Sequence, residues 1–344
     1  MKTMTKAGNY YYEQLNKEQQ KAYYAMKEGL LKLQDSFMVP MLSNKELSDI
    51  YALIRMDCPE IFYSVSFSYR YYADSTAVEM VPQYLFSKDK IKEHRQAMES
   101  RVKKLARQAE NLDEKEKELY IHDFIVNNVK YDKLKKEYSH EIIGALGNGV
   151  AVCEGIAKAV KILCDELGIW CIIALSEANP DKGIKYRHAW NVIRIDGQYY
   201  HLDVTFDNTL SKDDMVRYDY VNLSDKQIFR DHEPVIWKVP ECPDNDHFYY
   251  KDKKVSWTTM EEVQNRTKQA VKKGKVLLFH WRGGYLTREI LSELMEIFDK
   301  EARSKDKRAY VSVNWPQAVL RVRFAEGAGE EQLEMEEANE GEKE

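Results

Sequence analysis

The chain has 344 residues, 44% hydrophobic residues and a net charge of −5, a profile typical of a globular protein with a sizeable core. It contains no run of about 18 apolar residues and no leader-like segment, so we expect a cytoplasmic protein without a membrane span. The lysines are spread along predicted helices, which argues against a nucleic-acid partner, and five irregularly spaced cysteines do not suggest a disulfide scaffold. The length predicts two or three domains, and the oligomeric state stays open.

Residues 1–110 predict a small helical, α+β domain. Alternating apolar residues and β-branched or aromatic side chains at 61–72 and 77–86 favour a hairpin. A short apolar segment occupies 37–42. The expected helices cover residues 9–33, 43–56 and 90–108.

Residues 111–240 predict the central domain. An apolar stripe favours a helix over 113–129, and a brief helix over 139–146 precedes a glycine-punctuated loop. A long amphipathic helix is expected over 153–167. The dipeptide Asp196-Gly197 is a strong hairpin signal between two of three expected strands, 169–175, 189–195 and 198–204. A polar loop over 207–214, a further strand over 218–223 and a short helix from Ser224 complete the region.

Residues 241–324 predict a smaller α/β domain with strand and helix signals in alternation. Its expected elements are 248–257, a helix at 260–273, a strand at 276–281, a helix at 286–302, and strands at 309–313 and 318–324. The last twenty residues hold nine Glu and one Lys, so residues 325–344 are predicted to be an acidic disordered tail.

Cys153 begins the long amphipathic helix of the central domain. Backbone N–H groups at a helix N-terminus favour negative charge, which biases a cysteine there towards thiolate. The same position is also compatible with a small buried apolar residue, the usual role of a free cysteine. The residue alone therefore leaves a structural and a nucleophilic role open.

His188 and Asp203 flank the predicted hairpin and favour the nucleophilic role. A cysteine nucleophile needs an imidazole nearby, and that imidazole needs a partner to fix its other nitrogen. Closing the turn at Asp196-Gly197 brings His188 and Asp203 to about cross-strand distance. The order Cys, His, Asp is therefore a candidate nucleophile, base and orienting residue.

Three motifs appear in order in this region: Val-Cys-Glu-Gly-Ile-Ala at 152–157, Arg-His-Ala-Trp-Asn-Val at 187–192 and His-Leu-Asp-Val-Thr-Phe-Asp at 201–207. With them, residues 113–231 resemble the transglutaminase-like superfamily, including its bacterial members, whose papain-like core carries a Cys-His-Asp triad. The resemblance implies an α+β fold in which the nucleophile helix packs on an antiparallel sheet, here flanked by smaller α/β domains.

By the same resemblance, Cys153 is the nucleophile, His188 the general base and acid, and Asp203 the residue that orients the imidazole. The implied enzyme is a cysteine peptidase or acyltransferase that attacks amide bonds of a protein or peptide substrate through an acyl-thioester, with hydrolysis favoured over amine cross-linking. No cofactor is expected. Candidates for a second oxyanion donor or for substrate contact are Tyr131, Asn148 and Trp190, beside the N–H of Cys153.

Other interpretations were weighed against this one. His201 is a second-best base, because it lies on the same strand face as Asp203. No zinc spacing links the cysteines and histidines, so no metal site is expected, and the glycines do not match a phosphate-binding loop. The main alternative is a non-catalytic peptide-binding or scaffolding module with a vestigial triad.

Overall fold

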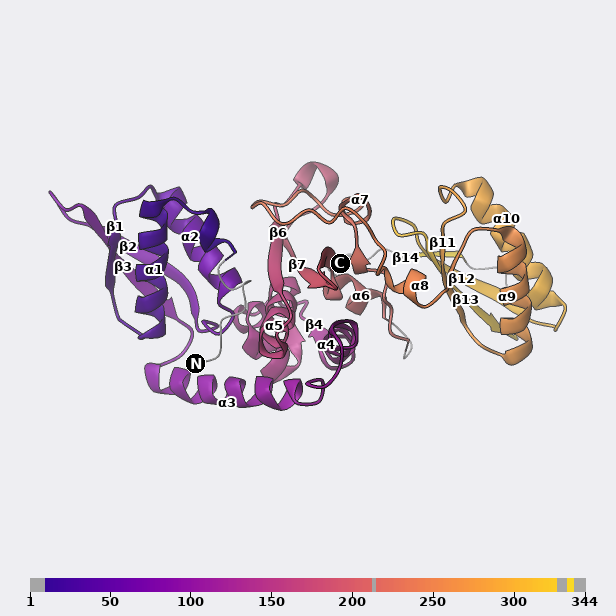
Figure 1. Cartoon of the computed structure of the whole chain (residues 1–344), viewed down its shortest axis with the longest axis horizontal. Helices are drawn as coiled ribbons and strands as arrows, with labels where there is room; N and C mark the ends of the chain where they lie inside the picture. Colours follow the sequence, from indigo (N-terminus) through magenta and orange to yellow (C-terminus); the bar gives the residue numbers. More distant parts are fainter. Residues whose placement is uncertain (1–9, 212–214, 327–332, 337–344) are drawn as a thin grey trace.

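The computed structural model describes residues 10–211, 215–326 and 333–336, arranged as three consecutive regions along the longest axis (Figure 1). Each region has its own sheet, and the mixture of helices and antiparallel strands confirms the predicted α+β class. One continuous apolar core runs through the N-terminal and central regions, while a second lies within the C-terminal region. The boundary proposed at residue 110 is therefore not a break in the core.

The N-terminal region has two helices on a three-stranded antiparallel sheet of order β1-β3-β2. Both helices begin with a capping box, in which the side chains of Asn16 and Ser43 accept backbone N–H groups three residues later. A long third helix runs beneath this region towards the central one (Figure 1). The elements are η2 (Tyr12–Gln14), α1 (Lys17–Leu31), β1 (Phe37–Pro40), α2 (Asn44–Asp57), β2 (Ser64–Tyr71), β3 (Ala77–Tyr84) and α3 (Lys88–Ala106).

The central region packs one buried helix, α5 (Cys153–Leu167), against an antiparallel sheet of order β6-β7-β8-β9. The predicted helix over 153–167 and the hairpin at Asp196-Gly197 are both confirmed. The other elements are α4 (Glu114–Asn128), β4 (Lys130–Tyr131), η3 (Glu137–His140), η4 (Ile143–Asn148), β5 (Val150–Ala151), β6 (Cys171–Ser176), η5 (Pro180–Lys182), β7 (His188–Ile195), β8 (Gln198–Leu202), α6 (Val204–Leu210), β9 (Val221–Leu223) and α7 (Asp225–Ile228).

One expectation in the central region is wrong. Val204, expected as the last residue of a strand, begins α6, and this helix replaces the first part of the polar loop predicted over 207–214. The side chain of Asp203 accepts the N–H groups of Thr205 and Phe206, so it caps the helix. A local capping bond outweighs the strand pattern that precedes it.

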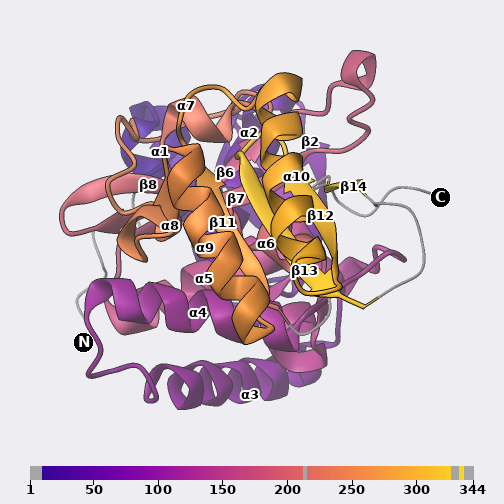
Figure 2. The ribbon, with the colours of Figure 1, turned by 90° about the vertical axis from the view of Figure 1, so that its right-hand side faces the viewer.

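The C-terminal region places two helices side by side on one face of a mixed sheet of order β10-β11-β13-β12-β14 (Figure 2). Two expectations fail here. In the segment 248–257, expected as a strand, residues 249–252 form a short helix and only 256–257 are a strand. Leu333–Glu336 pairs with β12 as a parallel strand instead of belonging to a disordered tail. The rest of that predicted tail after Glu326 lies outside the described residues. The elements are α8 (Tyr249–Asp252), β10 (Ser256–Trp257), α9 (Met260–Lys273), β11 (Leu277–Trp281), α10 (Arg288–Arg303), β12 (Arg308–Asn314), β13 (Val319–Ala325) and β14 (Leu333–Glu336).

In the described ranges, we find no helix with both the length and the apolar character needed to cross a membrane.

Candidate active site

Cys153 is the first residue of α5 and is 6% exposed. The preceding residue, Val152, has no side chain that can cap the helix. The backbone N–H groups of the first turn can therefore donate to another acceptor, at the positive end of the helix dipole. A Cβ atom on Gly155 would lie 2.2 Å from the carbonyl oxygen of Ser139. Glycine is therefore required where η3 approaches the start of α5.

The topology brings His188 to the same end of the core as Cys153. The chain turns at Gly168, at the end of α5, directly into β6, which runs back along the helix. β7 is antiparallel to β6, with His188 opposite Ser176, so β7 runs in the direction of α5. The first residues of α5 and β7 therefore lie at one end of the helix–sheet layer.

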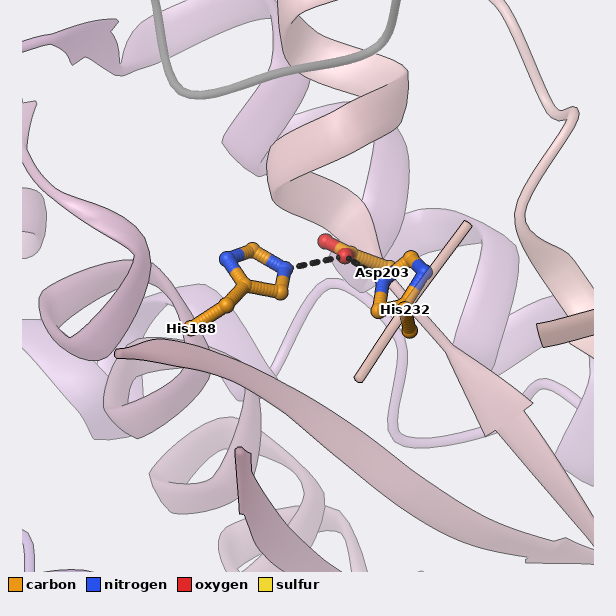
Figure 3. Close-up of side chains that lie close together, drawn as sticks. All are labelled: His188, Asp203 and His232. Carbon is orange, nitrogen blue, oxygen red and sulfur yellow. Dashed lines mark hydrogen bonds and ion pairs between the residues drawn. The ribbon is translucent and has the colours of Figure 1, made fainter. Parts of the chain in front are cut away.

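His188 and Asp203 form a buried hydrogen-bonded pair. The Nε2 atom of His188 lies 2.6 Å from Oδ2 of Asp203, and the other ring nitrogen, Nδ1, points away from the carboxylate (Figure 3). The second oxygen of Asp203 is held by the backbone of α6. The aspartate can therefore fix the imidazole with Nδ1 left for another partner, as an orienting residue must.

Part of the chain is similar in sequence to a known family. Residues 102–204 match the sequence model of the "Transglutaminase-like superfamily", and the match includes Cys153, His188 and Asp203. The chain contains a transglutaminase-like core. No curated protein sequence is significantly similar to it.

Similar solved structures share low sequence identity with the chain. They include "Crystal structure of a TGase", with 12% identity over 53% of both chains and a TM-score of 0.29. A "Putative Cysteine Protease from Cytophaga hutchinsonii" has 17% identity over 41% of this chain and 61% of its own, with a TM-score of 0.26. A "putative protease" from Parabacteroides distasonis has 15% identity over 41% of this chain and 36% of its own, with a TM-score of 0.24. This chain thus matches 36% to 61% of the length of those proteins.

A second histidine contacts the aspartate of the transglutaminase-like core. The Nε2 atom of His232 lies 2.8 Å from Oδ2 of Asp203, the oxygen that His188 also contacts (Figure 3). Its Nδ1 atom lies 2.8 Å from Asp231. His232 follows α7, 29 residues after Asp203, in a segment where no sequence pattern pointed to the site. It lies beyond the family match, and only the tertiary fold brings it there.

The pKa values of Asp203 and His232 are both shifted by their neighbours. Burial alone would raise the pKa of Asp203, but the charge and hydrogen bond of His188 and the hydrogen bond of His232 hold it far below its usual range. Burial alone would lower the pKa of His232, yet the two carboxylates on either side raise it above the usual value. Asp203 is therefore a carboxylate and His232 favours the imidazolium form.

Trp190 and His201 form a separate hydrogen-bonded pair behind the transglutaminase-like site. The Trp190 ring is parallel to that of His188, with 5.8 Å between centroids, and its Nε1–H donates to Nδ1 of His201 at 2.9 Å. Because Nδ1 accepts, Nε2 of His201 carries the proton and donates to Asp225 at 2.8 Å. Both nitrogens of His201 are therefore engaged, and the Trp190 N–H is taken up by His201.

The other two oxyanion candidates lie on the chain segments that lead to Cys153. Tyr131 ends β4 and is paired with Ala151 of β5, two residues before Cys153. Asn148 is exposed at the end of η4. Between them, Asp132 organises the connecting loop, because its carboxylate accepts the Ser139 hydroxyl at 2.5 Å and two backbone N–H groups.

Glu154, next to Cys153, links the central region to the N-terminal region. Its carboxylate lies 3.0 Å from Arg55 of α2 and 2.8 Å from Lys158, and Arg55 also contacts Glu141 at 2.6 Å. Burial would raise the pKa of Glu154, but the charges of Arg55 and Lys158 and a hydrogen bond with His140 keep it well below its usual value.

Two groups of side chains in the described residues have the composition of a metal site: His188, Asp203 and His232, and His201, Asp225 and Cys242. In the first, both nitrogens of His232 face carboxylates, so its imidazolium has no lone pair for a metal. In the second, the proton on Nε2 of His201 is fixed by the Trp190 contact at Nδ1. The hydrogen bonding of both groups fits charge networks better than metal ligation.

Proposed function

We propose that this protein is a cysteine-nucleophile enzyme that cleaves amide bonds of a protein or peptide substrate through an acyl-thioester. The observation that carries the proposal is the 2.6 Å pair between His188 Nε2 and Asp203 Oδ2, at the end of the core where α5 begins with Cys153. A buried carboxylate that orients an imidazole beside a helix-terminal cysteine is what thiolate formation needs.

Each residue of the proposed triad has a separate role in acyl transfer. The Cys153 thiolate attacks the amide carbonyl, and the negative charge that develops on its oxygen is stabilised by N–H groups at the start of α5. The imidazolium of His188 donates its Nδ1 proton to the leaving amine as the C–N bond breaks, leaving an acyl-thioester. Neutral His188 then takes a proton from the molecule that resolves the thioester, while Asp203 holds the ring in place.

We favour water as the molecule that resolves the thioester. Hydrolysis needs no second substrate site, whereas cross-linking needs a site that admits an amine and keeps water away from the thioester. The products are then a cleaved peptide or a deamidated glutamine side chain.

The alternative is a non-catalytic peptide-binding or scaffolding module. The two functions differ in their dependence on the sulfur atom, because binding does not require a nucleophile. A peptide-library digest analysed by mass spectrometry, with and without a primary amine donor, compares wild type with Cys153→Ala. We expect cleavage or deamidation products only with wild type and no gain in rate from the amine. Products that are unchanged by Cys153→Ala would contradict the proposed nucleophile.

A further inference from the structure

A cavity of about 700 Å³ lies between the central and C-terminal regions. On one side it is lined by α7 and the residues around α8, and on the other by the end of β11 and the turn from β12 to β13. Four of its lining residues are basic, Lys226, Arg230, Lys251 and Arg282, and none is Asp or Glu. The cavity is thus a local positive site in a chain of net charge −5.

Within the described ranges, none of the four basic side chains forms an ion pair with a carboxylate, and three of them contact neutral oxygen atoms. Arg230 donates to the carbonyl oxygen of Pro316 at 2.8 Å, Arg282 donates to that of Ser256 at 3.4 Å, and Lys251 contacts the side-chain oxygen of Asn245. Neutral acceptors orient these side chains but leave their charge uncompensated. An anionic ligand would therefore gain Coulomb energy without displacing an existing ion pair.

Three of these basic side chains lower the pKa of His280, which also lines the cavity. Burial and then the charges of Arg230, Lys251 and Arg282 lower the pKa of His280 to about 4, against a smaller opposing effect of the Asp219 carboxylate. Its Nδ1 lies 2.7 Å from the Ser256 hydroxyl, which fixes the ring at the cavity wall. The lining of the cavity and the lowered pKa of His280 both indicate that Arg230, Lys251 and Arg282 lie around the same space.

Aromatic side chains complete the lining. Tyr285 is 85% exposed, whereas Trp281, which also lines the cavity, is buried and Trp315 is half-buried. Large exposed aromatic side chains beside arginines are typical of surfaces that bind polypeptide chains. A long nucleic acid would need a basic track across the surface, which a single basic cavity on an acidic protein does not supply.

We infer that this cavity is a binding site for an acidic polypeptide segment, whose carboxylates contact Lys226, Arg230, Lys251 and Arg282. Its volume suits several residues of an extended chain better than a single phosphate. The site does not depend on the proposed chemistry at Cys153, although α7 and the following residues connect it to His232. It would give the protein a second recognition element for protein partners or substrates with Asp- or Glu-rich sequences.

Fluorescence anisotropy with a labelled oligoglutamate peptide tests the inference, and an oligoglutamine peptide of equal length serves as the ligand control. The protein variant is Lys226→Glu with Arg282→Glu, both at exposed positions. The matched control is Lys268→Glu with Lys272→Glu on exposed positions of α9, which changes the net charge equally. Thermal unfolding verifies that both variants fold.

We expect the cavity variant to weaken oligoglutamate binding by at least about tenfold, and the α9 variant to change it less than about twofold. Binding should weaken with salt and should be unchanged by Cys153→Ala, so that failure of the catalytic proposal leaves this test intact. Equal effects of the two variants, equal binding of oligoglutamine, or tighter binding of inorganic phosphate or a single-stranded oligonucleotide would overturn the inference.

Discussion

His188 and His232 contact the same carboxylate oxygen, Oδ2 of Asp203, at 2.6 and 2.8 Å. One negative charge is therefore shared between the imidazole next to the nucleophile helix and a second, buried imidazole. Asp231 supplies a further carboxylate on the far side of His232. The four residues form an alternating series of acids and bases, so His232 is placed to set how strongly Asp203 acts on His188.

Replacing His232 by Gln should move the pH dependence of activity. Without the second cation, the Asp203 carboxylate stabilises the imidazolium of His188 more strongly. The alkaline limb of the pH–rate profile should therefore shift upward by about one pH unit. Initial rates from pH 5 to 10 on a peptide substrate measure it. His247→Gln, at a partly exposed histidine on the surface, is the control. A uniform fall in rate with no shift of either limb would assign His232 a purely structural role.

Replacing Asp203 by Asn should lower kcat by a factor on the order of 10³–10⁴, as expected when an amide takes the place of an orienting carboxylate. The amide can still accept the N–H groups of α6 through its oxygen, so the helix cap should survive. Asp203→Ala should lose the cap as well and be less stable than Asp203→Asn by about 1 kcal/mol. Kinetics and urea denaturation of both variants separate these roles. Full activity of Asp203→Asn would remove the aspartate from the proposed triad.

Arg55 should matter for stability far more than an exposed arginine. Arg55→Met leaves the buried Glu141 and the partly buried Glu154 with Lys158 as the remaining cation near both, and should cost about 3–5 kcal/mol. Arg70→Met, which breaks an ion pair on the surface of the N-terminal sheet, should cost less than about 1 kcal/mol. Urea denaturation compares the two. Equal losses would mean that the Arg55 network contributes nothing beyond a surface ion pair.

Glu118 should make stability depend on pH. Burial raises the pKa of Glu118 to about 7, against a hydrogen bond from Asn222 that lowers it. Since the folded state holds this proton more tightly than the unfolded state, stability should fall as pH rises from about 4.5 to about 7.

Glu118→Gln removes that titration. The free energy of unfolding of the variant, relative to that of wild type, should therefore rise by about 3 kcal/mol between pH 4.5 and pH 8. Denaturant unfolding at the two pH values provides the measurement, with Glu110→Gln at an exposed position as the control. A constant difference between Glu118→Gln and wild type at both pH values would contradict the raised pKa.

The sequence predicts the nucleophile helix and the hairpin well because their signals are local. The apolar spacing after Cys153 and the left-handed Gly168 define both ends of α5, and Asp196-Gly197 defines the turn between β7 and β8. The pairing of His188 with Asp203 follows from that hairpin. These signals need only neighbouring residues.

The remaining features depend on contacts between distant segments. His232 reaches Asp203 only after the chain has passed through α6, β9 and α7, and Arg55 reaches Glu154 across 99 residues of sequence. The helical start at Val204 depends on a cap that Asp203 makes while it also contacts two histidines. No periodicity or spacing encodes such pairings.

The most direct test of the proposed mechanism is the alkylation rate of Cys153 by iodoacetamide at pH 6, measured by peptide mapping. The buried thiols of Cys58, Cys164 and Cys242, whose pKa values burial raises, are internal references; for Cys164 the contact with Cys171 raises the pKa most. We predict that Cys153 reacts at least about tenfold faster in wild type than in His188→Ala, because an imidazolium stabilises the thiolate. Equal rates in the two proteins would contradict an activated Cys153 and with it the proposed enzyme.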